Sequence, residues 1–364
     1  MRVEMLDVTE QYQLIRDEFE PKLRSILESG RYVAGEHVQE FEVAFGAFAS
    51  ASHVIACNSG TSALHASLLA LGVKSGDEVI VPANTFIATA SAVILAGATP
   101  VVVDVDPSTY LIDMSKIESA IGPRTVGVIP VHLYGGLVDM IRVKEIADRS
   151  SLWIIEDAAQ AHGATRDGYS PGKHSNMATY SFYPGKNLGA LGEGGAIVTN
   201  DIALARKLRL IINWGSEQKY KHEMFGLNYR MDEIQGAALS SKLKIISQSN
   251  ERRRLIAEQY FEAIALPTIN QNLKGQSVHH VFVVLSERRD LLRDYLSNQG
   301  IGTGIHYPHS IHKNSAIANL CRVPEETEHS DRITGESLSI PIHGSMKSED
   351  VDFVVSAVNA FTNQ

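Results

Sequence analysis

The stretch "SFYPGKNLGALGEGGAIVTND" (residues 181–201) places a single lysine, Lys186, between an aromatic-rich run and a glycine-rich turn. The small glycine residues allow unusual backbone angles and the close approach of a ligand. A buried lysine loses solvation, which lowers the pKa of its amine and leaves a nucleophile able to form a Schiff base with a carbonyl compound. We therefore interpret Lys186 as the candidate chemical centre. A solvent-facing lysine in a flexible loop is the alternative.

Short apolar runs flank this stretch and alternate with helical segments such as "SALHASLLALG" (62–72) and "LVDMIRVKEIADRS" (137–150). Runs that are apolar on both faces are typical of buried parallel strands, which helices then cover. The pattern therefore predicts an α/β fold. The predicted strands are 78–81, 100–105, 126–131, 152–156, 178–182 and 196–199.

The sequence changes in character near residue 246. A charged helix (249–264) is followed there by an apolar run (278–285), a second helix (288–300) and a histidine-rich loop. We expect two domains: a large domain over residues 1–245 that includes an N-terminal helical segment, and a smaller α+β domain over residues 246–364.

Composition excludes several classes of protein. The formal net charge of -9 and the pI of 5.9 argue against a broad nucleic-acid-binding surface, although a local basic group could still bind a small anionic substrate. The two cysteines, Cys57 and Cys321, have no metal-type spacing and favour a reducing, cytoplasmic location. The start of the chain lacks a secretory signal, and prolines interrupt the uncharged segment 79–103, so neither export nor a membrane span is predicted.

Ligands of open α/β sheets bind at the carboxyl ends of the strands, where this chain has polar residues. In "NSGTSAL" (58–64), the turn at Gly60 and Thr61 leads directly into a helix. The free N–H groups of such a helix start could bind a phosphate; simple capping of the helix by serine or threonine is the alternative.

Two further strand ends carry candidate groups. Asp157 follows the strand at 152–156 and could hold a proton on a heteroaromatic nitrogen, while Gln160 could bind a neighbouring oxygen. A helix cap is the alternative for this pair. Phe86 follows another strand and offers a flat surface to a planar ring, with a place in the core as its alternative.

Rival motifs fit poorly. The two P-G-K segments lack the first glycine and the hydroxyl residue of a P-loop, and Ile197 stands where a dinucleotide fingerprint needs its third glycine. The G-x-S-x-G around Ser170 has Pro171 after the serine, which cannot donate an N–H to an oxyanion. His306, His309 and His312 lack carboxylate or cysteine partners with ligand spacing, so we interpret their loop as facing the substrate and predict no metal.

An ordered set of motifs resembles the pyridoxal-phosphate-dependent sugar aminotransferases of the DegT/DnrJ/EryC1/StrS type, over nearly the whole chain. This resemblance implies fold type I, with a mixed, mostly parallel seven-stranded sheet covered by helices. The motifs are "NSGTSAL", "VPANTFIATASAV", "VHLYGG", "IIEDAAQAHGA", "YSFYPGKNLGALGEGGAIVTND", "GLNYRMDEIQGAAL" and "QGIGTGIHYPHSIH".

The resemblance also implies roles for individual residues. Lys186 resembles the lysine that binds pyridoxal phosphate covalently and later moves a proton. Asp157 resembles the partner of the pyridine nitrogen, Gln160 the contact to the ring hydroxyl, and Phe86 the residue that stacks on the ring.

The phosphate of the cofactor has its own matching residues. Gly60, Thr61 and Ser181 resemble the phosphate ligands of one subunit, and Asn228 resembles a ligand that arrives from the neighbouring subunit. The resemblance therefore implies a homodimer with shared active sites.

The implied reaction moves an amino group from glutamate to a keto group of a nucleotide-linked sugar, here C3 of a dTDP-3-keto-6-deoxyhexose. His309 and Ser310 depart from the family pattern near the sugar and put that sugar in doubt. The expected substrate contacts are Tyr183, Lys219, Tyr220, Arg230, His306 and Tyr307.

Two alternatives stay open. The chain could aminate a keto-cyclitol or another ring without a nucleotide, or it could be a regulatory homologue without catalysis. The presence of Lys186 argues against the second alternative, and against the dehydratases of this family that carry histidine at this position.

Overall fold

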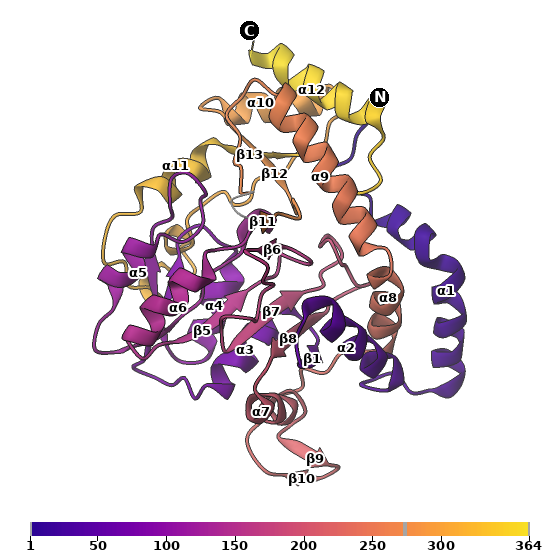
Figure 1. The fold of residues 1–364 in the computed structure, drawn as a ribbon, viewed down its shortest axis with the longest axis vertical. Helices are drawn as coiled ribbons and strands as arrows, with labels where there is room; N and C mark the ends of the chain where they lie inside the picture. The colour runs from indigo at the N-terminus through magenta and orange to yellow at the C-terminus, as the bar shows by residue number, and fades with distance from the viewer. Residues whose placement is uncertain (1, 272–274, 363–364) are drawn as a thin grey trace.

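A seven-stranded sheet forms the centre of the computed structural model, which describes residues 2–271 and 275–362 (Figure 1). The strand order is β1-β8-β7-β5-β4-β2-β3. The sheet is mostly parallel and lies between helices, so the predicted α/β class is confirmed. The strands are β1 (His53–Cys57), β2 (Glu78–Pro82), β3 (Thr99–Val103), β4 (Thr125–Val128), β5 (Trp153–Asp157), β7 (Met177–Ser181) and β8 (Gly195–Thr199).

One edge of the sheet is antiparallel. β8 pairs antiparallel with both β7 and β1, whereas the apolar run 196–199 suggested one more parallel strand. The connection from β7 to β8 contains no crossover helix, and only a crossover could make the two strands parallel. This connection carries Lys186. The edge strand β1 was not among the predicted strands.

Helices cover both faces of this sheet and create two cores. Side chains of β1 alternate between them: Val54 and Ala56 face the core under α2, α5, α6 and α8, while Ile55 and Cys57 face the core under α3, α4 and α7. The helices are α1 (Val8–Ser29), α2 (Glu36–Ala49), α3 (Gly60–Ala70), α4 (Ile87–Leu95), α5 (Met114–Ala120), α6 (Met140–Arg149), α7 (Ile202–Ile212) and α8 (Glu233–Leu243).

The C-terminal part forms a smaller α+β unit around the antiparallel pair β12 (Phe282–Leu285) and β13 (Ser337–Ile340). The N-terminal segment joins this unit, because Val3 pairs with Ile301. The long helix α9 (Ile246–Ala263) runs between the two parts (Figure 1). The boundary after residue 245 stays a prediction. The other helices here are α10 (Arg289–Asn298), α11 (Glu328–Glu336) and α12 (Ser348–Thr362).

Several short elements complete the fold. β9 and β10 form a hairpin that projects below the sheet in Figure 1. No helix in the described ranges is long and apolar enough to cross a membrane. The short strands are β6 (Thr165–Arg166), β9 (Ser216–Gln218), β10 (Lys221–His222) and β11 (Gly275–Gln276), and the 3-10 helices are η1 (Leu133–Gly135), η2 (Ile311–Lys313) and η3 (Ala318–Leu320).

Helix starts follow local capping chemistry. The helix expected at 62–72 begins two residues earlier, at Gly60, because the Ser59 side chain accepts a hydrogen bond from the Ser62 N–H. The helix expected at 137–150 begins only at Met140, because Asp139 caps it in the same way.

A buried carboxylate joins α2 to α8. Glu233 is 3% exposed, and its side chain accepts hydrogen bonds from the backbone N–H groups of Gly35 (2.6 Å), His37 (3.0 Å) and Val38 (3.2 Å). A negative charge at the N-terminus of α2 is favourable both for these unpaired donors and for the helix dipole. The contact therefore attaches the N-terminal helices to the body of the protein.

We expect Glu233→Gln to lower the free energy of unfolding by ~1–3 kcal/mol, because the amide replaces a buried charged acceptor that three N–H groups share. Urea unfolding followed by circular dichroism measures this loss. Glu36→Gln, on the exposed surface of the first turn of α2, is the control and should change little. Equal effects of the two substitutions would contradict the assigned role.

Candidate active site

A cavity of about 530 Å³ lies at the carboxyl ends of β5 and β7 and reaches the C-terminal unit at residues 280–281 and 306–307. Ten of the residues predicted from the sequence line it, although they come from distant parts of the chain. They are Gly60, Thr61, Phe86, Asp157, Gln160, Ser181, Tyr183, Lys186, His306 and Tyr307.

Four predicted residues lie outside this lining. Asn228 and Tyr220 are exposed, the latter at 83%, and the Arg230 side chain donates to the Asn228 side-chain oxygen Oδ1 (3.1 Å). With Lys219 they belong to the segment around the β9–β10 hairpin. Their predicted contacts with cofactor and substrate stay predictions.

The chemistry of Lys186 depends on its environment. Its backbone N–H donates to the Tyr183 carbonyl (2.8 Å) in the turn after β7, which turns the side chain into the cavity lining. The side chain keeps some surface toward the cavity, but desolvation by the surrounding protein lowers the pKa of its amine to about 8, against the opposing effect of the Asp157 charge. A neutral, nucleophilic amine is therefore accessible near physiological pH.

Asp157 ends β5 beneath the cavity and is 6% exposed. Its Oδ2 accepts from the Thr89 hydroxyl (2.9 Å) and its Oδ1 from the Ala159 N–H (3.2 Å). Burial raises the pKa of this carboxyl, although the two hydrogen bonds and the charge of Lys186 act in the opposite direction. A cationic ring nitrogen placed beside this carboxylate would fit the site, because it would supply the missing counter-charge.

A phosphate-sized anion fits at the start of α3. Ser59 caps this helix, and the first turn directs N–H groups toward the cavity side lined by Gly60 and Thr61. Glycine is required for the packing here: a Cβ at Gly60 would lie 2.7 Å from the Ser181 Cβ, and one at Gly195 would lie 2.3 Å from the Ser59 carbonyl oxygen. The close contact places the Ser181 side chain beside the helix start.

The Gln160 amide has a defined orientation. Its Oε1 accepts from the backbone N–H of Tyr134 (2.6 Å), and its Nε2 donates to the Tyr307 hydroxyl (3.1 Å). The second hydrogen on Nε2 remains available to an oxygen atom on the ring of a bound ligand. Tyr134 has a left-handed backbone (φ 64°), and its hydroxyl donates to the His306 carbonyl (2.7 Å), so it connects Gln160 to the loop at 306–307.

Phe86 is available for stacking. Its side chain is 52% exposed at the cavity, and its ring centroid lies 5.3 Å from that of Tyr307. The alternative interpretation of Phe86 as a core residue is therefore wrong. A planar ring could lie against it.

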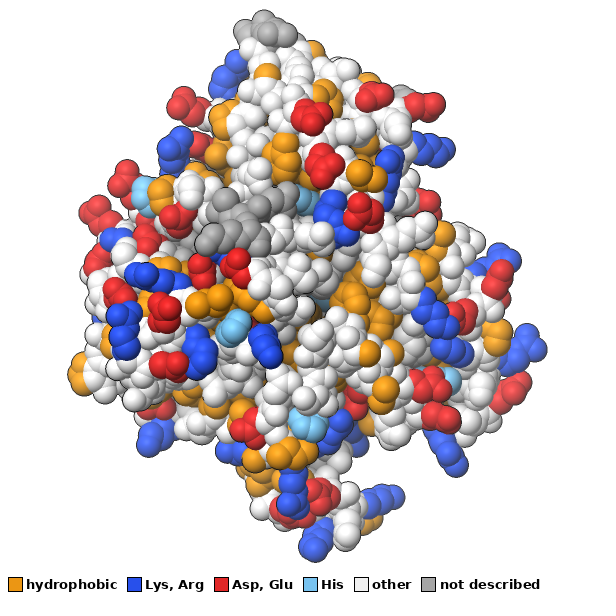
Figure 2. Space-filling view, viewed as in Figure 1, with side chains coloured by type: hydrophobic (Ala, Val, Ile, Leu, Met, Phe, Trp, Pro, Cys, Tyr) orange, Lys and Arg blue, Asp and Glu red, His pale blue; other side chains and the backbone are white. Residues whose placement is uncertain are grey.

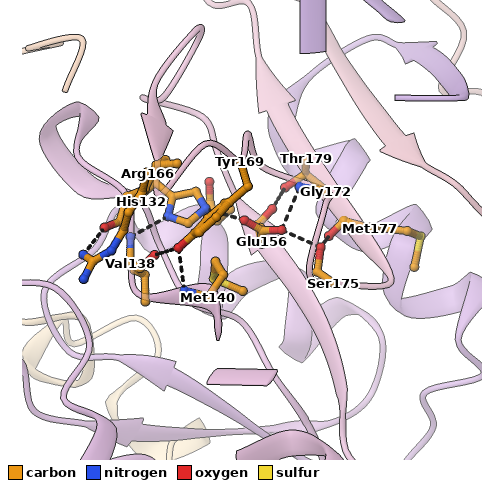
Figure 3. A network of polar contacts seen from close by, with 12 residues as sticks. His132, Val138, Met140, Glu156, Arg166, Tyr169, Gly172, Ser175, Met177 and Thr179 are labelled. Carbon is orange, nitrogen blue, oxygen red and sulfur yellow. Dashed lines mark hydrogen bonds and ion pairs between the residues drawn. The ribbon is translucent and has the colours of Figure 1, made fainter. Parts of the chain in front are cut away.

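A buried network supports the other face of β5 (Figure 3). Glu156 accepts from the Gly172 N–H (2.7 Å) and the Ser175 hydroxyl (2.5 Å), and it contacts His132 Nε2 at 2.7 Å. The Val138 N–H donates to His132 Nδ1 (3.1 Å), so the ring proton lies on Nε2 and points to the carboxylate. This network fixes the turn at 132–138, which carries Tyr134.

Sequence reasoning missed several residues of the cavity wall. Met5 and Leu6 line it because the N-terminal segment packs along the C-terminal unit, which no local sequence signal reveals. Glu193 lies inside the glycine-rich stretch, so its position was visible but its role was not considered. His280 lies in the apolar run 278–285, which was interpreted only as a strand.

Comparison with known proteins agrees with this geometry. The profile of the DegT/DnrJ/EryC1/StrS aminotransferase family matches residues 13–359. The erythromycin biosynthesis sensory transduction protein EryC1 of Saccharopolyspora erythraea is 43% identical over 99% of this chain and 100% of its own length. The dTDP-3-amino-3,4,6-trideoxy-alpha-D-glucose transaminase of Streptomyces venezuelae is 41% identical over 100% of this chain and 97% of its own length.

A solved structure shows the same fold. The crystal structure of S. venezuelae DesV in complex with a ketimine intermediate is 41% identical in sequence, covers 100% of this chain and 99% of its own, and has a TM-score of 0.97. The protein is thus a transferase, and its cofactor is pyridoxal phosphate, which the buried amine, the carboxylate and the helix start fit. The chain belongs to the DegT/DnrJ/EryC1/StrS aminotransferase family.

Proposed function

We propose that this protein transfers an amino group from glutamate to the 3-keto group of a dTDP-linked 6-deoxyhexose. The observation that carries the proposal is the meeting of Lys186, Asp157 and the start of α3 in one cavity. The transaminase of S. venezuelae, named for a dTDP-3-amino sugar, supports the substrate class. The printed names do not include the amino donor, so glutamate rests on the sequence resemblance.

In this proposal each side chain has a separate task. The amine of Lys186 binds the cofactor, and after release it takes and returns the proton at the substrate carbon. Asp157 holds a proton on the ring nitrogen, and Phe86 supports the ring face. Pyridoxal phosphate, when bound, supplies the electron sink that stabilises the carbanion.

Anchoring and substrate binding use the remaining groups. Gly60, Thr61 and Ser181 would hold the phosphate of the cofactor at the helix start, where N–H groups and the helix dipole favour an anion. Tyr183, His306 and Tyr307, which also line the cavity, contact the sugar. Gln160 donates its remaining amide hydrogen to the hydroxyl oxygen of the cofactor ring.

We also propose a homodimer with shared active sites. Lys186 is the one lysine or arginine among the described residues that line the cavity, yet the cofactor phosphate and a pyrophosphate both carry negative charge. Asn228, Arg230 and Lys219 are outside the lining of their own chain, so we assign them to the site of the partner. The basic groups of Arg230 and Lys219 then attract the substrate in a protein of net charge -9.

Two other parts of the proposal concern the whole chain. The cysteines Cys57 and Cys321 are both free, which supports a reducing, cytoplasmic location. On the face shown in Figure 2, basic and acidic side chains are interspersed, which supports the absence of a nucleic-acid partner. The domain division remains 1–245 and 246–364.

A regulatory role is the second candidate, because the name of the EryC1 relative describes sensory transduction. The lowered pKa of Lys186 favours catalysis, since a regulatory protein has no use for a buried reactive amine. The keto-cyclitol alternative remains an outcome of the substrate test below.

We expect cofactor-free protein to capture pyridoxal phosphate at a rate that rises with pH and reaches half its maximum near pH 8. Only the neutral amine attacks the aldehyde, and the pKa of Lys186 is lowered to about 8, below the usual ~10.4 of lysine. Stopped-flow absorbance of the yellow product measures the rate at each pH. The reaction of a free lysine derivative corrects for the titration of the cofactor itself.

Lys186→Ala should lose the capture while its circular dichroism stays unchanged, and Lys173→Ala, at an exposed position, should retain it. A wild-type protein that stays colourless would refute the cofactor-binding role of Lys186. A midpoint near that of the free lysine derivative would refute only the lowered pKa.

Subunit sharing predicts complementation between two impaired variants. Random exchange of Lys186→Ala and Asn228→Ala chains makes half of the dimers mixed, and each mixed dimer has one complete site of two, so about a quarter of the wild-type activity should return. Mass spectrometry confirms the mixed dimers, and an assay with glutamate measures the activity. Mixed dimers without recovered activity would exclude shared sites.

The substrate assignment predicts selective amination. With glutamate, the protein should convert a dTDP-3-keto-6-deoxyhexose to an amino sugar and leave a keto-cyclitol unchanged, because only the first has a pyrophosphate for the basic groups. Mass spectrometry of the products measures both reactions in parallel. Preferential amination of the cyclitol would favour the alternative substrate class, and amination of neither would favour the regulatory role.

A further inference from the structure

The carbonyl oxygen of Ser181 lies where the sheet stops pairing. Ser181 ends β7 opposite Gly195 of β8, and the neighbouring pair is joined by a hydrogen bond from the Phe182 N–H to the Gly194 carbonyl (2.7 Å). Because hydrogen-bonded and non-hydrogen-bonded pairs alternate in an antiparallel ladder, the Ser181 carbonyl points away from β8. On the side of β5, pairing with β7 goes only as far as Thr179. The Ser181 carbonyl therefore has no strand partner among the described residues.

The His162 side chain supplies the missing donor. Its Nε2 lies 2.9 Å from the Ser181 carbonyl oxygen, and a carbonyl oxygen only accepts, so the ring proton lies on Nε2. Nδ1 has no hydrogen-bond partner in the described part of the chain. Burial, together with the charge of Lys186, lowers the pKa of His162 to about 3, so the ring stays neutral at physiological pH. The contact to Ser181 is therefore a hydrogen bond of fixed direction.

The surroundings of His162 hold its ring in place. The side chain is 0% exposed, and its ring centroid lies 5.4 Å from that of Tyr180 and 5.7 Å from that of Phe182. Its backbone carbonyl oxygen accepts from the Nδ2 of Asn250 in α9 (2.8 Å). Packing and hydrogen bonds around a supporting side chain keep a binding group in its productive geometry. His162 is thus a rigid support for the end of β7.

The hydroxyl of Ser181 is prepared to donate to a ligand. Its Oγ accepts from the Tyr183 N–H (3.3 Å), which leaves the hydroxyl proton for another acceptor. The side chain borders the cavity beside Gly60, where a Cβ would lie 2.7 Å from the Ser181 Cβ. An anion at the start of α3 would also meet the free N–H groups of the first turn. A phosphate oxygen fits both kinds of donor.

We propose that His162 is a positioning residue for the phosphate site: it holds the Ser181 carbonyl through Nε2 and so keeps the Ser181 hydroxyl at the start of α3, where it donates to the phosphate of the cofactor. The inference rests on the proposed phosphate-binding role of Ser181. His162 does not line the cavity, so it acts only through Ser181. Without the imidazole donor, the buried carbonyl would be unpaired, and rotation of its peptide group toward another donor would displace the hydroxyl.

Three substitutions separate the donor from the packing. In His162→Gln, the amide nitrogen can take the place of Nε2, and no hydrogen bond is lost at Nδ1, which has no partner in the described part of the chain. The side chain of His162→Asn is too short to reach that position, and His162→Leu has apolar bulk without a donor. His53→Leu is the matched control, because His53 starts β1 outside the cavity lining.

The readout is the gain in affinity that the phosphate supplies: the dissociation constant of pyridoxal divided by that of pyridoxal phosphate, from absorbance titrations of the cofactor-free protein. His162→Asn and His162→Leu should lower this ratio about tenfold, because a displaced hydroxyl loses a hydrogen bond to a charged group. His162→Gln and His53→Leu should keep the wild-type ratio. An unchanged ratio in the Asn and Leu variants, or an equal loss in the Gln variant, would overturn the proposal.

A double substitution distinguishes this role from a general structural one. If His162 acts through Ser181, adding His162→Leu to Ser181→Ala should not lower the ratio further, whereas additive losses would overturn the proposal. A wild-type ratio in Ser181→Ala alone would refute the phosphate-binding role of Ser181, and this inference with it. A loss in Ser181→Ala without a loss in the His162 variants would refute only the positioning role. Circular dichroism checks folding, and the Asn and Gln variants decide the question if the Leu variant does not fold.

Discussion

The desolvation of one amine is the constraint on which the rest of this structure depends. Lys186 lies in the connection between two antiparallel strands at the edge of a mostly parallel sheet, where the chain turns without a crossover helix. The surrounding protein lowers the pKa of the amine to about 8, and the neighbouring imidazoles are neutral for the same reason. Asp157 is the carboxyl group whose charge acts on this amine. The burial that stabilises the fold thus also prepares the nucleophile.

The contacts that pack the sheet against α3 also position the residues of the candidate active site. A side chain at Gly60 or Gly195 would collide with Ser181 or Ser59, so the absence of a Cβ lets β7, β8 and the start of α3 meet closely. Consecutive residues of β5 point to opposite faces of the sheet: Asp157 lies beneath the cavity, while Glu156 fixes His132 on the other side (Figure 3). The positions of the binding groups therefore follow from the regular geometry of the sheet.

The C-terminal unit completes the cavity and also fixes it. His280, His306 and Tyr307 come from this unit, and Asn187 connects the lysine turn to residues 278–280 through two hydrogen bonds and to α9 through a third. A shift of this unit relative to the sheet would move the amine as well as the cavity wall. The scarcity of basic groups in the lining is the physical reason to look to a second subunit for the charge that a phosphorylated substrate needs.

The sequence alone determined the α/β class and singled out Asp157, Phe86 and Lys186, which the structure places in one cavity, because periodicity, glycine spacing and residue chemistry are local properties. It did not reveal the antiparallel direction of β8, since a buried strand is apolar in either direction. The places of Met5, Leu6 and His280 in the cavity wall were decided by tertiary structure alone. They depend on contacts between segments far apart in the chain, and those contacts exist only after the N-terminal segment, the sheet and the C-terminal unit have packed together.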